Sequence, residues 1–250
     1  MRQRKFLVIS ILLAISMLAG CASLPETNML TPAKKPDVGP TGEPTEAKPN
    51  PPFLQRFLSP PAQLYDIEAI AGSLFEGVNK ERWEQAQAGL ANLQNVWAET
   101  KPLLGAMKGV EAADSAMNKL SASVAAREIT ASYENLTAFM AAVSDIGKSF
   151  KLSPLSDIVA VGNTARNVAF YTEDKNWLKT ASKVKELEGT WKQVRPSMEQ
   201  IGIFGELTHA HSLVKELKDA VNAENKSSVE EKLADLNESM SRIRQFYYGR

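Results

Sequence analysis

Side chains that could do chemistry on their own are scarce in this sequence. Its 250 residues include one cysteine, Cys21, and two histidines, His209 and His211. On a helix, a spacing of two places side chains about 200° apart, on opposite faces. The two histidines therefore lack the spacing with which an HExxH helix binds zinc. We interpret them as surface or capping residues, and we expect neither a metal nor another cofactor.

Other signs of catalysis are weak. Carboxylates such as Glu81, Glu84, Glu186 and Glu188 stand among Lys and Arg at helical spacing, which is typical of solvated faces. The sequence has no glycine-rich phosphate loop, no Gly-x-Ser-x-Gly elbow and no Gly-x-His-x-x-Glu string of the imelysin kind. Basic and acidic residues number 29 each, which argues against a nucleic-acid binder. The sequence predicts a protein that is not an enzyme.

The position of Cys21 gives it a different chemistry. A basic start precedes an uncharged stretch at 6–20, which is typical of a secretory signal peptide and short for a membrane span. The stretch ends Leu18-Ala19-Gly20-Cys21, which resembles the lipobox of bacterial lipoproteins. The resemblance implies a diacylglyceryl group on Cys21, removal of the signal peptide at 1–20 and acylation of the new amino terminus. An ordinary signal peptide with a chance cysteine is the alternative.

A lipid on Cys21 would decide where the protein lies. Each buried methylene contributes roughly 0.8 kcal/mol, and two or more acyl chains give stable attachment. Removing residues 1–20 takes away three basic residues and no acidic one, which leaves a net charge of −3. Surface charge would then add nothing to membrane binding. Ala22 replaces the Asp that retains enteric lipoproteins at the inner membrane, so we expect the cell envelope, on the extracytoplasmic side, at the outer membrane if the host has one.

The segment 21–62 has a composition of its own. It holds ten of the thirteen prolines and is rich in Glu, Thr, Lys and Asn. This predicts a lipidated cysteine followed by a disordered tether, which could reach about 125 Å as a polyproline helix. One apolar interruption, Phe53–Leu58, either docks on the folded body or touches the bilayer.

Beyond residue 62 the hydrophobic period is that of helices throughout. Two stripes are clearest: Ile129, Tyr133, Leu136, Met140, Val143, Ile146 and Phe150, and Val229, Leu233, Leu236, Met240, Ile243 and Phe246. Ser227 and Ser228, each with a Glu three residues later, predict capping boxes before the second stripe. With Pro and Gly pairs as helix ends, the predicted helices are 64–78, 80–100, 111–126, 129–150, 156–171, 174–194, 206–223 and 227–247.

The tryptophans form a repeated pattern. Trp83 and Trp97 stand fourteen residues apart, as do Trp177 and Trp191, and a Lys-Pro or Arg-Pro pair follows the second Trp of each. Other matches keep the same order, at offsets that drift from 91 to 97. We interpret this pattern as an internal duplication.

The duplication predicts helical repeats at 63–154 and 155–250, each with four helices. The fold class is then all-α, a duplicated antiparallel helix bundle or a short helical array of about eight helices. A step of fourteen residues returns to nearly the same helix face, so core packing is the simplest role for the tryptophans. The functional alternative is an aromatic groove lined by Trp83, Trp97, Trp177 and Trp191.

The two-Trp helix, followed by a partly polar helix and a Leu-rich helix, resembles a family of short membrane-anchored helical proteins of spore-forming bacteria. The resemblance covers about 170 residues and implies an envelope setting and no activity. This chain departs from that family in being duplicated and in carrying a lipobox. We expect a non-catalytic binding or scaffolding module with an envelope protein as partner. The alternative is a small-ligand carrier or sensor with a pocket between the helices.

Overall fold

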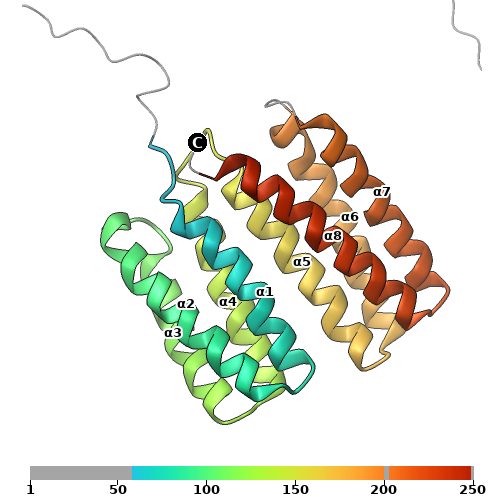
Figure 1. Cartoon of the computed structure of the whole chain (residues 1–250), viewed down its shortest axis with the longest axis horizontal. Coiled ribbons are helices and arrows are strands. Elements are labelled where there is room, and N and C mark those ends of the chain that lie inside the picture. The colour runs from blue at the N-terminus through green and yellow to red at the C-terminus, as the bar shows by residue number, and fades with distance from the viewer. Residues whose placement is uncertain (1–57, 200–202, 249–250) are drawn as a thin grey trace, which may run out of the picture. The chain divides into compact units, whose positions relative to one another are not determined.

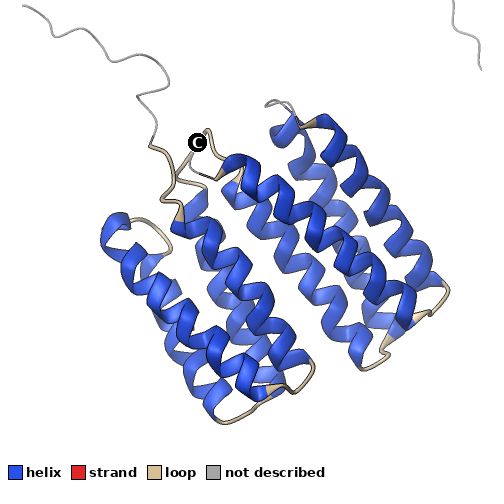
Figure 2. Cartoon of the chain, viewed as in Figure 1, coloured by secondary structure: helices blue, strands red, loops and turns tan. Residues whose placement is uncertain are grey.

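The computed structural model describes residues 58–199 and 203–248, which belong to one compact unit, 50–250. The described residues form eight helices and no strand, which confirms the all-α fold class (Figure 2). The helices are α1 (Gln63–Asn79), α2 (Trp83–Leu104), α3 (Val110–Ala125), α4 (Ile129–Gly147), α5 (Leu155–Glu173), α6 (Trp177–Glu199), α7 (Phe204–Asn222) and α8 (Lys226–Tyr247).

The eight helices form two antiparallel four-helix bundles that lie side by side (Figure 1). Helices α1 to α4 make bundle 1 and helices α5 to α8 make bundle 2, and in each bundle every helix packs on its two neighbours. The bundles meet where α5 packs on α4 and α1. The boundary that we predicted after Pro154 falls at the end of the loop joining the bundles, and the duplication itself stays an interpretation.

The apolar stripes form the cores of the bundles. Every member of the α4 stripe except Ile129 is buried, and so is every member of the α8 stripe except Phe246. These two side chains pack against the core while partly exposed. Burying one face of each amphipathic helix against its neighbours is what holds a bundle together.

One turn geometry joins the helices within all four hairpins. Each hairpin has a non-glycine residue in the left-handed conformation, with φ between 51° and 58°: Glu81, Arg127, Lys175 and Glu224. The residue after it donates its N–H to a carbonyl five residues back, as Arg82 does to Gly77 at 2.7 Å. This is the Schellman motif, which satisfies the free carbonyls at a helix end. The turns at 81 and 175, and those at 127 and 224, stand at the offsets of the sequence repeat.

Four predicted helix boundaries were wrong, two starts and two ends. Helices α2 and α6 begin at Trp83 and Trp177, because the left-handed turn residue keeps the preceding positions out of the helix. Both helices also run through the proline that we expected to end them, Pro102 or Pro196. A proline two or three residues from the end of a helix keeps a helical φ, and its missing N–H and the clash of its ring with the carbonyl four residues back disturb only the last turns.

The start of α8 also differs from the prediction. Its N-cap is Asn225, whose side-chain oxygen accepts the Ser228 N–H at 3.1 Å, so Ser227 and Ser228 lie inside the helix. Asn is as good an N-cap as Ser, and here it follows directly on the left-handed turn residue Glu224.

Candidate functional site: a trough between the bundles

A trough runs between the two bundles. Helices α1 and α8 stand on either side of α5 and both pack on it, which makes α5 the floor and the other two the walls. Two cavities of about 400 and 220 Å³ follow one another along this line and share Gly72, Arg166 and Asn237 as lining residues. We call the two cavities together the α1–α5–α8 trough.

Apolar and polar side chains both line the trough, and several of them are small. Its larger cavity is bordered by Gly72, Phe75, Ala165, Ala169, Leu233 and Ala234. A Cβ atom added to Gly72 would meet nothing within 4 Å, so the space above this position is open. A guest could therefore approach the α1 backbone closely at this point, because no side chain stands in the way.

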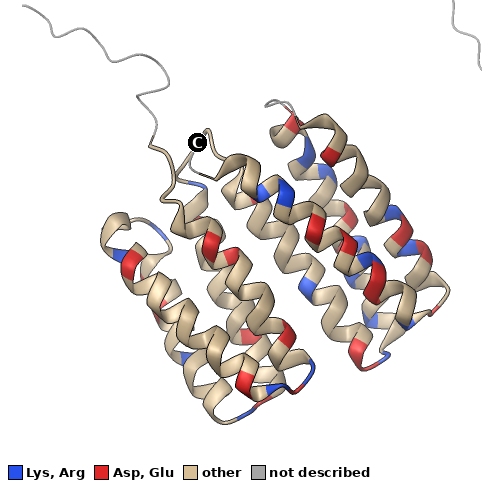
Figure 3. Cartoon of the chain, in the orientation of Figure 1, with Lys and Arg blue, Asp and Glu red and all other residues tan. Residues whose placement is uncertain are grey.

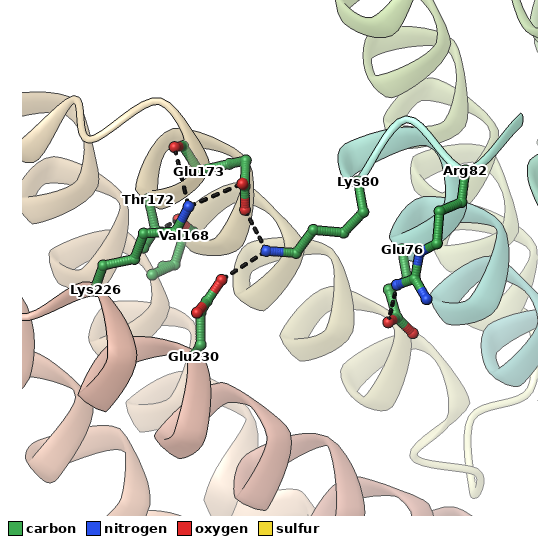
Figure 4. Close-up of polar contacts among 8 residues, drawn as sticks. All are labelled: Glu76, Lys80, Arg82, Val168, Thr172, Glu173, Lys226 and Glu230. Atoms are coloured by element: carbon green, nitrogen blue, oxygen red, sulfur yellow. Dashed lines mark hydrogen bonds and ion pairs between the residues drawn. The ribbon is translucent and has the colours of Figure 1, made fainter.

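An ionic network closes one end of the trough (Figure 4). Lys80, from the end of α1, binds Glu173 of α5 at 2.5 Å and Glu230 of α8 at 2.6 Å, and Lys226 binds Glu173 at 2.8 Å. Burial lowers the pKa of Lys80, but the hydrogen bonds to its two carboxylates outweigh this and raise it above its usual value. Burial likewise raises the pKa of Glu173, and the two lysines outweigh it and lower the pKa. Lys80 and Glu173 are thus both charged at neutral pH.

A second bridge joins α1 to the end of α8, two residues before Glu68 and four residues after Arg244, which line the smaller cavity. The Tyr248 hydroxyl, just past α8, lies 3.1 Å from a carboxylate oxygen of Asp66 on α1, and its ring lies 6.4 Å from that of Tyr65. Asp66 and Lys80 are separated by fourteen residues of α1, which corresponds to about 21 Å. The space between the two bridges therefore fits a guest of about four helical turns.

A buried ion pair lies in the floor. Arg166 of α5 donates two hydrogen bonds to the carboxylate of Glu68 of α1, at 2.8 and 3.3 Å, and both side chains are more than nine-tenths buried. A Cβ atom at Gly162 would stand 1.9 Å from a Glu68 oxygen, so only glycine leaves room for the pair. A buried charge is costly without its partner. The pair therefore joins the two bundles at a point where neither residue could easily be lost.

One nitrogen of Arg166 is left over. Its Nε is buried and has no hydrogen-bond partner, although the guanidinium also reaches Asn163 at 3.4 Å. Nearby, burial lowers the pKa of Arg244 on α8, and Glu68 and Asp66 oppose this effect. The two arginines on α5 and α8 thus lie near the two carboxylates of α1, which oppose their charge.

Two of the four predicted tryptophans are core residues. Trp97 is 4% exposed and Trp191 is 1% exposed. The Trp97 indole donates to Asp114 at 2.7 Å, and the Trp191 indole donates to His211 at 3.2 Å. These rings lie in different bundles and fill space between helices.

The other two tryptophans open helices. Trp83 and Trp177 are the first residues of α2 and α6, partly exposed and packed against the core. None of the four tryptophans lines either cavity of the trough. The structure does not bring the four rings together into one groove.

The remaining predicted residues are placed as follows. His209 is exposed and His211 is partly buried beside Trp191. The described part of the chain holds no group of three or more His, Cys, Asp or Glu side chains that could bind a metal. Cys21 and residues 53–57 lie outside the described residues, and Leu58 is exposed.

One feature of the sequence indicates the helix that lies beneath the trough. Arg166 is the only charged residue between Asp157 and Glu173. A helix that is apolar on every side is surrounded by other helices, and a lone charge within it needs a buried partner. The pattern could have identified α5 as the central helix, but not which acid pairs with Arg166.

No helix within residues 58–199 and 203–248 is long and apolar enough to cross a membrane. Comparison of the chain with protein-family models, with curated proteins and with solved structures finds no match. The resemblances seen in the sequence therefore stay predictions.

Proposed function

We propose that the protein is a lipid-anchored cell-envelope module that binds a partner and catalyses no reaction. The lipobox sequence at Leu18–Cys21 supports the anchor, and Ala22 favours the outer membrane in a host that has one. Basic and acidic residues are interspersed over both bundles in the view of Figure 3, and they number 29 each in the sequence, which does not favour a nucleic acid as partner. The lipid would hold the body at the membrane, and the body would supply the binding site.

The observation that carries the binding role is the α1–α5–α8 trough. Two antiparallel helix walls over a helical floor offer grooves into which a further helix can pack, and small side chains such as Gly72 and Ala234 allow close approach. The guest that fits is an amphipathic helix of an envelope protein. Its apolar face would be about four turns long, the distance between the two bridges.

A second candidate is a carrier of elongated apolar molecules. The bridges at Lys80 and Asp66 bound the trough at both ends, as a ligand site requires and a protein interface does not. A cavity of about 400 Å³ is also within the range of small-molecule sites. A fatty acid that raises the melting temperature of the chain through mass action would favour this candidate.

The anchor is tested by the variant Cys21→Ser. Without the thiol there is no site for the diacylglyceryl group, so the precursor should remain uncleaved or leave the membrane fraction. Fractionation and the mass of the purified chain measure both outcomes. A Cys21→Ser chain that still matures and stays with the membrane would refute the lipid anchor.

The trough is tested by filling it with the variant Gly72→Leu. The new side chain enters open space, and leaving glycine favours the helix by roughly 0.8–1 kcal/mol, so the fold should persist. We expect the intact chain, crosslinked in its own membranes, to capture a stoichiometric partner that Gly72→Leu loses.

Gly189→Leu is the matched control. Gly189 also lies inside a helix with nothing within 4 Å of an added Cβ, but on α6, away from the trough. This variant should keep the partner. Equal capture by both variants, or no partner with the native chain, would contradict binding of a partner in the trough.

A further inference from the structure

The helical body has two ends of different construction. Because the helices alternate in direction, one end collects the chain entry at 58–62, the α2–α3 and α4–α5 connections, the start of α7 and the end of α8 (Figure 1). We call it the loop end. The opposite end, here the turn end, collects the four tight turns of the hairpins.

Exposed apolar side chains gather at the loop end. Of the six large apolar side chains that are exposed among the described residues, five lie there: Leu58, Leu103, Leu152, Phe204 and Tyr248. Leu58 is 71% exposed and Phe204 is 61% exposed. The sixth, Leu178, lies in the first turn of α6 at the turn end. Single exposed apolar residues need no explanation, but their concentration at one end does.

The tight turns of the turn end present charged side chains. All four left-handed residues at its turns carry a charge and are exposed: Glu81, Arg127, Lys175 and Glu224. Smaller side chains, glycine above all, would suit that backbone better. The two ends therefore face different surroundings.

Hydrogen bonds hold parts of the loop end as one surface. The Tyr65 hydroxyl lies 2.7 Å from the Ser153 hydroxyl, which joins the start of α1 to the loop between the bundles. The Tyr247 hydroxyl donates to the Met198 carbonyl at 3.0 Å, which joins the end of α8 to the end of α6. The apolar residues near them are thus presented from fixed positions.

We propose that the loop end is a membrane-contact surface, whose exposed leucine, phenylalanine and tyrosine side chains insert among lipid head groups. The occupant is a bilayer because the chain joins the body at this end, at Leu58, so a lipid on Cys21 lies upstream of the loop end. In that respect the inference rests on the proposed anchor. Exposed Lys108 and Lys151 stand near Leu103 and Leu152, where their ammonium groups can reach water while the stems lie along lipid.

The contact is apolar rather than electrostatic. The chain without residues 1–20 has a net charge of −3, and Lys101 and Lys148 at the loop end are paired with Asp114 and Asp145. Anionic lipid would therefore add little attraction. Contact should form on zwitterionic lipid and persist in high salt, because salt screens charge and leaves apolar burial intact.

The test uses the lipidated full chain in phosphatidylcholine vesicles, with one cysteine introduced at a time for an environment-sensitive fluorophore. Leu103→Cys, Leu152→Cys and Phe204→Cys report on the loop end, and Leu178→Cys is the matched control at the turn end. For the first three labels, we expect the emission to shift to shorter wavelength and to become brighter when vesicles are present than when they are absent. For the fourth label, we expect no change. High salt should leave this difference unchanged.

Three results would overturn the proposal. The first is an equal response of all four labels, and the second is a response that needs anionic lipid and disappears in salt. The third is loop-end labels that are already shielded without vesicles, which would indicate a protein cover. The parent chain checks the anchor separately, because labelling of its Cys21 would show a free thiol. The same four positions, compared in a Cys21→Ser chain with added vesicles, would then still test the surface.

Discussion

The two bundles share the positions of their buried tryptophans, and they differ in the polar group that each tryptophan contacts. Trp97 and Trp191 occupy the same position of α2 and α6, and each donates its indole N–H to the following helix. The acceptor is a carboxylate in bundle 1, Asp114, and an imidazole in bundle 2, His211. These acceptors stand 97 residues apart, the offset that the sequence repeat has reached at this point.

The comparison separates what the shared helix packing requires from what it tolerates. A large buried ring, an apolar stripe and a left-handed turn residue recur at matching positions, because they fix the packing of the helices. The polar acceptor needs only a free lone pair, so its chemistry can change. That change has a consequence for pH, since carboxylates and imidazoles become protonated in different ranges.

The largest effect is expected from removing the buried tryptophan that the two bundles share. Trp97→Ala and Trp191→Ala should each lower the free energy of unfolding by about 3–5 kcal/mol, because each removes a large buried side chain. Urea unfolding of the full chain measures this. Trp83→Ala, at a partly exposed ring, should cost clearly less. A silent variant at 97 or 191 would show that the ring contributes no packing.

A smaller effect sharpens the difference between the bundles. Burial, followed by Lys215 and Arg195, lowers the pKa of His211 below its usual value. The unfolded chain therefore takes up this proton more readily. Neutral His211 contributes fully to the free energy of unfolding when the pH is above the ordinary pKa of histidine. This contribution is lost as the pH falls toward and through the lowered pKa of His211 in the folded chain. Protonation at Nδ1 would also break the bond from Trp191, worth roughly 1 kcal/mol.

Asp114 behaves differently in the same position of bundle 1. Burial raises its pKa, but hydrogen bonds from Lys101 and Trp97 outweigh this and lower it, so the acceptor stays charged to lower pH. His211→Asp should reduce the loss of stability between neutral pH and about pH 5. Asp114→His should increase it, and unfolding measured across this range compares the two. His209→Gln is the control for the exposed histidine. An unchanged pH profile in both swaps would contradict the role of the acceptor.

The sequence predicted the helices better than it predicted the residues of the trough. Periodic stripes such as that ending at Phe246 predicted the helices, because a buried helix face leaves a periodic pattern in the sequence. Pro102 and Pro196 led to wrong predictions of the helix ends, since a proline near the end of a helix disturbs only its last turns. A pocket between the helices was the alternative, but the residues of the trough were not predicted, because they lie about a hundred or more positions apart, as Glu68 and Arg166 do. No local pattern records that pairing.

The tryptophans also show that a local pattern does not predict contacts between the bundles. Their spacing predicted one face of one helix for each pair, and this is a local property. Whether rings from two repeats meet depends on how the bundles are placed, which the spacing does not contain. Trp97 and Trp191 are buried in separate cores, and the trough between the bundles is lined by other residues.

The most direct test of the account places a photo-crosslinking residue at Asn237, which is exposed and lines both cavities of the trough. Illumination of the native envelope should give one defined adduct at 237. A crosslinker at Gly189 should give none, and Gly72→Leu should abolish the adduct at 237. A folded chain that forms no adduct at 237, or the same adducts at 237 and 189, would contradict a binding site between the bundles.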